Sequence, residues 1–369
     1  METLEINQNL THIGSKKATV VAMSGGVDSS VAAAMMSKDN KNVIGITLKL
    51  YDEKKIVKSK TCCAGSDIID AKRIASTINI PHYVLDYEAI FKEKVIDPFI
   101  AEYEAGRTPI PCINCNEKVK FLDLINFARK IGASSLVTGH YIKKIKTGDE
   151  WGLYIPADED RDQSYFLFSI KYEDLNYLDF PLGDFKKDEI RNFARNLKLH
   201  LYDKVDSQDI CFIPNGKYKE FIQKKSQSAP KGKIVDIRNN VLAEHGGIYN
   251  FTVGQRRGIG VSKKNPVYVK EIDAINNRVV VAEKEYIKSS SIIVERVNLL
   301  TKHKINDVYV RIRSSGKLLK AKISKLDNLY QVQLNEPEVA VSPGQACVFY
   351  KNDKNGTRLL GGGWIKSAS

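Results

Sequence analysis

The stretch "VVAMSGGVDSSVAAAMM", residues 20–36, decides the fold of the first part of the chain. Its apolar start predicts a buried strand, and residues 29–36 predict a helix of small side chains. Gly25 and Gly26 lie in the turn between them, where they permit positive φ and close approach of the backbone. The N–H groups at a helix start attract anions. The stretch therefore predicts a phosphate site, and the alternative interpretation is a tight turn capped by Ser and Asp.

The composition sets the class of protein. A chain of 369 residues predicts two or three domains, and 43% hydrophobic with 27% charged residues is typical of a globular protein. The chain has neither a run as apolar as a membrane span nor an apolar leader at its N-terminus, so we expect a cytoplasmic protein without membrane association. The net charge of +13 favours a nucleic-acid partner. A generally basic proteome is the alternative explanation.

The first part of the chain alternates strand-like and helix-like segments. Strands are predicted at 18–23, 43–48, 82–86 and 134–138, and helices at 29–38, 67–79, 87–104, 116–131 and 186–198. This order predicts an α/β fold, a doubly wound parallel sheet with helices on both faces. Ligands of such sheets bind at the carboxyl ends of the strands. Both the Ser-Gly-Gly turn and "TGHY", residues 138–141, follow a predicted strand.

The pattern changes after Cys211, where short β-rich runs replace helical periodicity. These runs are 233–238, 266–272, 278–282, 307–314, 318–324, 328–334 and 346–351. They predict small β domains. The expected domains are residues 1–211, 212–282 and 283–369, the middle one being small and the last one a candidate barrel.

Six cysteines in a chain of this kind indicate metal binding or thiol chemistry. Cys112 and Cys115 form a Cys-x-x-Cys pair. The helix expected from about residue 116 puts Cys115 at a helix N-terminus, which lowers a thiol pKa. The alternative is half of a zinc site, with Cys62 and Cys63 as the other half. Cys211, flanked by apolar residues, is by itself most simply a core cysteine.

Two further stretches carry weaker signals. The acidic stretch 157–170 predicts either a magnesium site or a solvated loop leading into an amphipathic helix. In the second case Arg161, Asp162 and Gln163 stand at the helix start. The strands of 308–323 carry basic side chains at alternate positions, which suits RNA phosphates or an ordinary solvated face.

The ordered motifs together resemble the bacterial tRNA-specific 2-thiouridylase family, of the PP-loop ATP-pyrophosphatase superfamily. They are "AMSGGVDSS" (22–30), "CCAGSDIIDAKRIA" (62–75), "TPIPCINCNEKVKF" (108–121), "TGHY" (138–141), "RDQSYFL" (161–167), "SQDICFIP" (207–214), "FTVGQRRGIG" (251–260) and "VSPGQACVFY" (341–350). The similarity runs nearly end to end. It implies a PP-loop domain, a small central domain and a C-terminal β-barrel.

The resemblance implies a reaction and a set of site residues. ATP with Mg²⁺ would activate the C2 oxygen of a tRNA wobble uridine. Cys211 would carry persulfide sulfur delivered by an upstream carrier or cysteine desulfurase, and Cys115 would be its nucleophilic partner. The implied ATP contacts are Ala22, Met23, Ser24, Gly25, Gly26, Val27, Asp28, Ser29, Leu48 and Gly139. The implied tRNA contacts are His140, Arg161, Asp162, Gln163, Arg311, Ile312 and Gln345.

One departure from the family pattern opens an alternative. Many members carry Asp where this chain has Cys112. Cys112 could be a spare thiol, or it could join Cys115 and Cys211 as the ligands of an iron–sulfur cluster with one open iron site. Two rival functions are a small-molecule ligase that adenylates its substrate and a non-catalytic RNA-binding protein. ATP turnover that depends on tRNA would exclude the first, and sensitivity to loss of Asp28 and Ser29 would exclude the second.

Overall fold

The computed structural model describes residues 18–38, 42–51, 65–206, 209–213, 216–225 and 230–369. Cys62 and Cys63 therefore lie outside the described residues, as do the first 17 residues. The chain forms two compact units that interleave along the sequence. The first comprises residues up to Lys94, Asn114–Gly216 and Asn352–Arg358; the second comprises Val95–Ile113, Lys217–Lys351 and Leu359–Ser369.

The first unit contains a parallel five-stranded sheet in the order β3-β2-β1-β4-β7. Its strands are β1 (Thr19–Ala22), β2 (Val43–Lys49), β3 (His82–Asp86), β4 (Ser135–Val137) and β7 (Leu178–Asp179). The predicted α/β class is confirmed. This order places β1 in the middle of the sheet. Parallel neighbours of this kind are joined by helical crossover connections.

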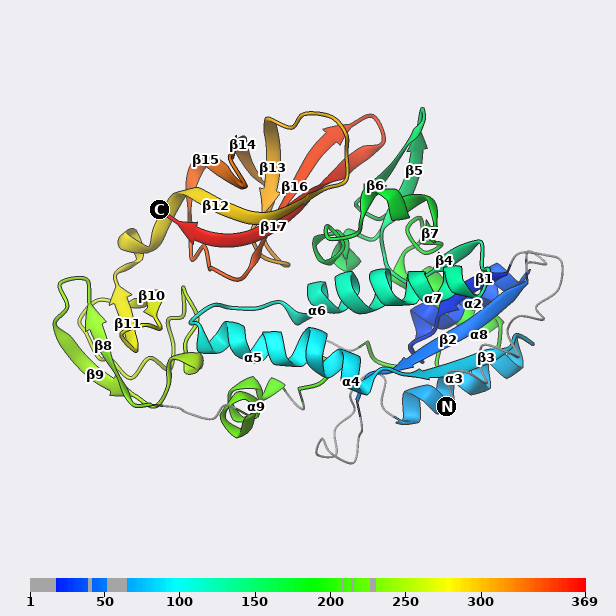
Figure 1. Ribbon diagram of the computed structural model, residues 1–369, viewed down its shortest axis with the longest axis horizontal. Coiled ribbons are helices and arrows are strands. Elements are labelled where there is room, and N and C mark those ends of the chain that lie inside the picture. Colours follow the sequence, from blue (N-terminus) through cyan, green and yellow to red (C-terminus); the bar gives the residue numbers. More distant parts are fainter. Residues whose placement is uncertain (1–17, 39–41, 52–64, 207–208, 214–215, 226–229) are drawn as a thin grey trace. The chain divides into compact units, whose positions relative to one another are not determined.

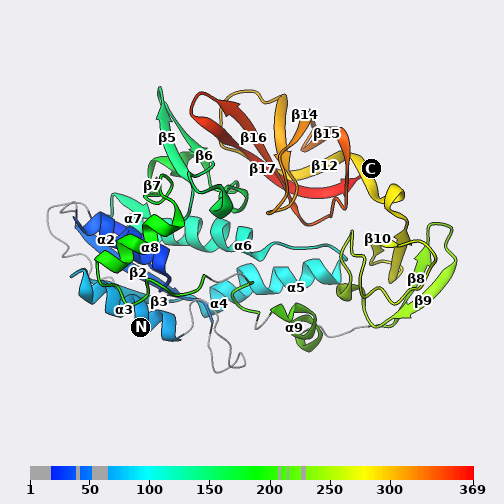
Figure 2. The same ribbon diagram turned by 180° about the vertical axis from the view of Figure 1, so that it is seen from behind.

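Helices cover both faces of this sheet. Its main helices are α2 (Val27–Lys38), α3 (Gly65–Thr77), α4 (Glu88–Phe91), α7 (Leu124–Lys130) and α8 (Lys187–Asn196). Side chains of α2, α3 and α8 share one apolar core with Val21 and Val137, which point to that face of the sheet. Leu136 points to the opposite face, where α7 packs against β4. Figure 1 shows α7 on one side of the sheet, and Figure 2 shows α2 and α8 on the other.

Two helical stretches are wound more widely than the sequence predicts. Short π-helices occupy η2 (Lys92–Ile96), between α4 and α5 (Asp97–Glu104), and η3 (Cys115–Asp123), between α6 (Pro111–Asn114) and α7. At the end of η3 the N–H of Leu124 donates to the carbonyl of Val119, five residues back. An i→i−5 bond adds residues to each turn and rotates the buried face. Val119, Phe121, Leu124 and Ile125 are buried in this stretch, whereas Leu122 and Phe127 are only partly buried.

The first unit also contains an antiparallel hairpin that the sequence did not indicate. Its strands are β5 (Lys143–Thr147) and β6 (Glu150–Tyr154). The turn residues Asn352–Arg358 of a later hairpin belong to the same unit. There the N–H of Ile155 donates to the carbonyl of Thr357 at 3.0 Å, and the Tyr154 hydroxyl donates to Asp353 at 2.9 Å.

The second unit begins with α5 (Asp97–Glu104), which stacks on α9 (Tyr218–Lys225) through Tyr103 and Tyr218, with ring centroids 5.2 Å apart. A four-stranded sheet follows in the order β10-β11-β8-β9. Its strands are β8 (Gly232–Asp236), β9 (Val241–His245), β10 (Tyr268–Asp273) and β11 (Arg278–Ala282). These strands enclose a small apolar core that includes Ile234, Val269 and Val279.

The last part of the second unit is a closed antiparallel barrel. Its strands run in the order β12-β15-β14-β13-β16-β17, and β12 pairs with β17 to close it. They are β12 (Lys288–Leu299), β13 (Asp307–Arg311), β14 (Leu319–Leu326), β15 (Leu329–Val339), β16 (Ala346–Asp353) and β17 (Gly356–Ala368). The predicted C-terminal barrel is confirmed, and the exact domain edges at 212 and 283 stay a prediction. Among the described residues, no helix is both long and apolar enough to cross a bilayer.

Candidate nucleotide site

The glycine turn after β1 has the predicted strand–turn–helix geometry. β1 ends at Ala22 and α2 begins at Val27. Gly25 has a φ of +75°, and a Cβ there would lie 2.1 Å from the carbonyl oxygen of Asp67. Only glycine avoids both the strain and the clash. The turn therefore brings its backbone against α3 while the first N–H groups of α2 stay at the carboxyl edge of the sheet.

Serine hydroxyls fix the shape of this turn. Ser29 Oγ accepts a hydrogen bond from the Ser24 N–H at 3.1 Å and lies 3.2 Å from the Ser24 hydroxyl. Ser30 Oγ donates to the carbonyl of Gly26 at 2.7 Å. Ser29 and Ser30 are buried, whereas Ser24 is exposed. A turn held in this way presents a hydroxyl and helix N–H groups to an anion without having to rearrange.

Asp28, on the first turn of α2, is held by two neighbours. Its carboxylate accepts the Tyr141 hydroxyl at 2.9 Å and the Lys187 ammonium at 2.8 and 2.9 Å. Burial, together with the Asp28 charge, raises the pKa of Tyr141 far above its usual value, so its hydroxyl stays protonated and donates. Lys187 also donates to Asp206 at 2.7 Å, and Arg161 contacts the other oxygen of Asp206 at 2.9 Å.

Gly139 follows β4 and lies directly against the glycine turn. A Cβ at Gly139 would meet the Ser29 nitrogen at 2.7 Å and the Asp28 carbonyl carbon at 2.8 Å. The predicted meeting of "TGHY" with the glycine turn at one edge of the sheet is therefore observed. Ala22, paired with Ile46 of β2, and the partly exposed Leu48 two residues further along β2 reach the same edge.

His140 has an aromatic environment. Its Nδ1 lies 2.7 Å from the Thr138 hydroxyl, and its ring packs near those of Phe121 and Phe180 at centroid distances of 5.7 and 6.5 Å. Burial, with Lys120 nearby, holds the pKa of His140 well below its usual range. His140 is thus a neutral imidazole, suited to stacking or hydrogen bonding rather than to binding phosphate as a cation.

The stretch 161–163 differs from its prediction. No α-helix begins there; two short 3₁₀ turns, η4 (Glu159–Arg161) and η5 (Ser164–Phe166), replace the expected amphipathic helix. Gln163 Oε1 accepts the Tyr141 N–H at 2.9 Å, and Asp162 Oδ1 accepts the Ser164 N–H at 2.9 Å. These side chains cap backbone groups and so keep the chain irregular. Arg161 and Gln163 nevertheless reach the neighbourhood of Asp28 through Asp206 and Tyr141.

The cysteines correct one prediction. α6 begins at Pro111, so Cys115 lies one turn inside a helical stretch rather than at its N-terminus. Cys115 is buried, and desolvation raises the pKa of its thiol. The expected lowering of that pKa is therefore wrong, because the desolvation exceeds the opposing effect of the Lys120 charge. Cys211 is partly exposed in the same unit, whereas Cys112 is exposed and belongs to the second unit.

No three His, Cys, Asp or Glu side chains converge as a metal-binding group among the residues that the structure describes. The acids of 157–170 form no such group either. Asp158 instead accepts the backbone N–H of Lys187 at 2.8 Å, at the start of α8.

The remaining predicted tRNA contacts lie in the second unit. The Arg311 guanidinium stacks on Tyr350 at 5.3 Å from the ring centroid. Ile312 is only 3% exposed, so a contact with RNA would have to use its backbone. Gln345 donates to the carbonyl of Thr108 at 3.0 Å, and the N–H of Thr108 donates to Pro343 at 2.9 Å. Two motifs far apart in sequence, 108–112 and 341–345, therefore meet.

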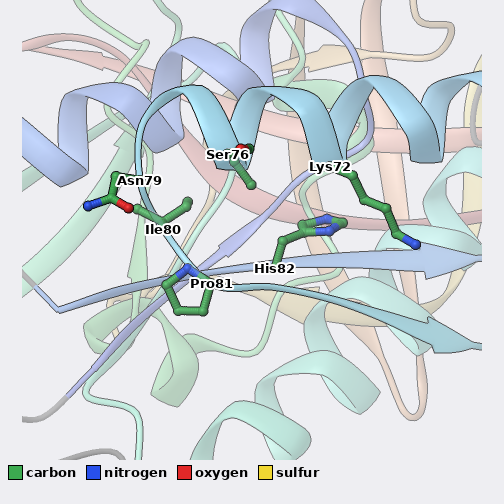
Figure 3. Close-up of a pocket in the computed structure, with 7 residues that line it drawn as sticks. Lys72, Ser76, Asn79, Ile80, Pro81 and His82 are labelled. Carbon is green, nitrogen blue, oxygen red and sulfur yellow. The ribbon is translucent and has the colours of Figure 1, made fainter.

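A hollow of about 530 Å³ lies elsewhere, beneath the end of α3. Figure 3 shows Lys72, Ser76 and His82 around it. His82 is the first residue of β3, so the hollow lies toward the amino ends of the strands, away from the glycine turn. Thr47 Oγ1 donates to the Met23 carbonyl at 2.7 Å, so His82 Nε2, 2.8 Å from that hydroxyl, is the donor to it. His82 therefore serves the sheet rather than a ligand site.

Lys187, Lys204 and Asp206 were missed by the sequence analysis. Lys187 stands in a run of charged residues, "KKDE", that is typical of a solvated helix start, yet its side chain is only 7% exposed. Lys204 and Asp206 precede the Cys211 motif by a few residues. Lys187 pairs with Asp28 and Lys204 pairs with Gly25, in each case more than a hundred residues away along the chain. No local pattern could indicate such pairings.

Three sequence-family models match the chain in succession. They are described as the tRNA methyl transferase HUP domain, over residues 17–215, the tRNA methyl transferase PRC-barrel domain, over 219–283, and the aminomethyltransferase beta-barrel domain, over 289–365. The first model alone covers more than half of the chain.

Curated relatives match over nearly the whole length. A protein of Rickettsia massiliae, named tRNA-specific 2-thiouridylase MnmA, is 50% identical over 96% of this chain and 99% of its own. The protein of the same name from Bartonella bacilliformis is 46% identical over 94% of this chain and 91% of its own. Among solved structures, the match to the NMN synthetase of Francisella tularensis covers 61% of this chain and 88% of that chain, at 16% identity and a TM-score of 0.34.

Proposed function

Because the chain belongs to the tRNA-specific 2-thiouridylase family, we propose that it is a tRNA-uridine 2-sulfurtransferase that uses ATP to thiolate the wobble uridine of tRNA. The observation that carries the proposal in this chain is the glycine turn, pinned by Ser29 and fixed against Gly139 at the carboxyl edge of a parallel sheet. That edge is where such sheets bind their ligands.

ATP is proposed to bind with its phosphates at residues 22–29 and its adenosine near Leu48 and Gly139. The N–H groups and hydroxyls of the turn favour negative charge there. Magnesium would accompany the phosphates and help to neutralise the departing pyrophosphate. The Asp28 carboxylate is engaged by Lys187 and Tyr141, so in this chain it acts first as an anchor of the turn.

Activation of the uridine precedes sulfur transfer. The C2 oxygen of uridine attacks the α-phosphate of ATP, the new O–P bond forms, and pyrophosphate leaves. This step converts a poor leaving group into AMP. A neutral His140, with Arg161 and Gln163, would help to place the tRNA nucleotide beside the turn, and Arg311, Ile312 and Gln345 would contact tRNA from the second unit.

Sulfur is proposed to come from a persulfide on Cys211, loaded by a sulfur carrier or a cysteine desulfurase. The terminal sulfur attacks C2 and AMP leaves. The Cys115 thiolate then attacks Cys211 Sγ, so that the sulfur bond to Cys211 breaks, 2-thiouridine is released and a Cys115–Cys211 disulfide forms, which an external thiol must reduce. Burial raises the pKa of the Cys115 thiol, so this thiol must give up its proton before it can attack.

The deciding experiment is an anaerobic thiolation assay with ATP and tRNA. The purified protein is tested for iron content and supplied with either a desulfurase system or free sulfide. Iron-free protein that is active with the desulfurase supports the persulfide route. Activity that appears only with bound iron would assign Cys112, Cys115 and Cys211 to a cluster instead.

The first prediction concerns Cys211 in that assay. Cys211→Ser should abolish thiolation and leave tRNA affinity nearly unchanged, because a single thiol adds little to phosphate contacts. Cys347→Ala is the control, since Cys347 is buried in the apolar core of the barrel, and it should retain thiolation. Thiolation by Cys211→Ser at the wild-type rate would remove Cys211 from the mechanism.

A further inference from the structure

The motif "FTVGQRRGIG", residues 251–260, has no role in the function proposed above. It lies in the connection between η8 (Ile248–Asn250) and β10, in the small sheet. Phe251 and Ile259, near its two ends, are both buried in the apolar core of that sheet. The residues between them, 252–258, are therefore anchored on both sides, and they are here termed the arginine loop.

Hydrogen bonds of Gln255 hold the arginine loop in one shape. Its side-chain oxygen accepts the N–H of Thr252 at 3.1 Å, and its side-chain nitrogen donates to the carbonyl of Arg257 at 2.9 Å. Its backbone carbonyl accepts the N–H of Val269, on β10, at 2.9 Å. The orientation of the amide is fixed, because a backbone N–H can only donate and a carbonyl can only accept. The backbone of the loop is therefore in place before any partner binds.

Arg256 and Arg257 are the exposed cations of the arginine loop. In the part of the chain that the structure describes, neither guanidinium has a hydrogen-bond or ion-pair partner. By contrast, Arg278 of the same small sheet lies 2.7 Å from Asp273. Two adjacent guanidiniums without an acid beside them favour an anionic partner, and their planar forks match the oxygens of a phosphate group.

The arginine loop contacts the barrel at a defined point. Gly254 has a φ of +86°, and a Cβ there would lie 2.2 Å from the Cβ of Ala340. Ala340 directly precedes the motif 341–345, which ends in the predicted tRNA contact Gln345. Five residues separate Ala340 from Gln345, a span of at most roughly 18 Å of extended chain.

The other predicted contacts of the barrel lie close to the same point. Arg311 and Ile312 are followed directly by Arg313, whose guanidinium reaches Glu338 at 3.4 Å. Glu338 precedes Ala340 by two residues. The arginine loop therefore borders both stretches of the barrel that are expected to contact tRNA.

We propose that the arginine loop is a further RNA-binding element, in which Arg256 and Arg257 bind phosphate groups of the tRNA that the barrel contacts. The proposal rests on the function proposed above, which supplies the tRNA. Because Gln255 already holds the backbone, the loop loses little conformational freedom on binding. Phosphate contacts position a nucleic acid without reading its sequence. The loop therefore determines how tightly tRNA binds rather than which nucleotide is thiolated.

The test is a filter-binding titration of the full-length protein with tRNA over a salt series. Arg256→Gln with Arg257→Gln should raise the Kd about tenfold and reduce the slope of log Kd against log salt by about 1.5–2, because two phosphate contacts are lost. In thiolation assays the same variant should raise the KM for tRNA and leave kcat within about twofold, the signature of lost uniform binding.

Two further variants complete the test. Lys231→Gln with Lys233→Gln is the matched control: it removes the same charge from exposed positions at the amino end of β8 and should change the Kd by less than about twofold. Lys263, which follows the arginine loop, lies 3.9 Å from Asp236 at the other end of that strand. Gln255→Leu removes the hydrogen bonds that hold the loop and no charge, so it should raise the Kd about threefold. Circular dichroism and thermal unfolding establish that each variant is folded.

The outcomes separate this inference from the function on which it rests. An unchanged Kd and salt slope in folded Arg256→Gln with Arg257→Gln overturn the RNA-binding role of the loop and leave the proposed function intact. Equal effects of the arginine and lysine pairs also overturn it, because net charge then explains the binding. A wild-type Kd in folded Gln255→Leu overturns the claim that the loop is held in place for RNA. Wild-type protein that binds no tRNA overturns the proposed function itself.

Discussion

At the scale of the residue, Gly139 shows how closely two chain segments approach at the site. The backbone of Gly139 touches that of Asp28 and Ser29, with no room for a Cβ. The groups in the way are backbone atoms at the first turn of α2, and these cannot move without distorting the turn. A side chain at position 139 would therefore displace the backbone of the first turn of α2, whose N–H groups are proposed to bind the anion.

Gly139→Ala should reduce ATP affinity by at least about tenfold and lower the free energy of unfolding by about 1–3 kcal/mol, the usual cost of overpacking. Isothermal titration with ATP and urea unfolding measure the two effects. Gly246→Ala is the control, because a Cβ there would have nothing within 4 Å. Unchanged ATP affinity in Gly139→Ala would show that the turn does not hold the nucleotide.

The residue scale also shows what the sequence could and could not predict. Ser24, Gly25 and Gly26 were recognisable because a strand, two glycines and a helix are consecutive. Lys187 and Lys204 were not, because any of the chain's many lysines could pair with Asp28 or Asp67 until the fold selects one. The pKa predicted for Cys115 was wrong for a related reason: the burial of Cys115 depends on side chains from elsewhere in the fold, which the local helix pattern does not contain.

At the scale of the element, β3 begins with a histidine that the fold keeps neutral. Burial, with Lys72 nearby, lowers the pKa of His82 to about 4. Between pH 6.5 and 4 the unfolded chain binds a proton at this residue and the folded chain does not. Stability should therefore fall as the pH drops through that window and should lose no more from His82 below it.

His82→Gln retains an N–H for Thr47 and removes the titration. The wild type should lose up to about 2 kcal/mol more than this variant between pH 6.5 and 4, a figure reduced from the full linkage value because His82 is only partly buried. Urea unfolding across the pH range measures the difference, and His303→Gln, at an exposed position, is the control. Parallel pH profiles for the wild type and His82→Gln would contradict the assignment.

Helices and strands were predictable where a single pattern of apolar residues runs through the whole element. All four strands predicted for the parallel sheet are observed, and β13 and β14 have the expected alternation. The strand β17 was missed because its glycines resemble a turn, yet Gly361 is needed where a Cβ would lie 2.2 Å from the carbonyl of Asn298 on β12. The π-helix η3 was missed because nothing in the sequence distinguishes its wider turns from those of the α-helix predicted over 116–131.

At the scale of the whole molecule, the net charge of +13 suits a polyanionic substrate. On β14, Lys320 and Lys322 are exposed while Ala321 and Ile323 fill the barrel core. Alternation thus gives a basic outer face on a strand whose other face is apolar.

Lys320→Gln with Lys322→Gln should weaken tRNA binding and reduce the slope of log Kd against log salt by about 2, if both lysines contact phosphates. Filter binding over a salt series measures both quantities. Lys224→Gln with Lys225→Gln removes the same charge from α9 and is the control. An equal effect of the two pairs would show that net charge, rather than this face of the barrel, attracts the RNA.

The interleaving of the two units bears on how the protein can be dissected. The tip of the last β-hairpin, Asn352–Arg358, belongs to the first unit and pairs with β6. A fragment ended near residue 283 would lack that strand, so β5 and β6 would become an isolated ribbon with a bare edge, which is marginally stable and prone to self-association. Recombinant fragments of the first unit should therefore keep this tip joined to β6. Circular permutation can achieve this, whereas truncation cannot.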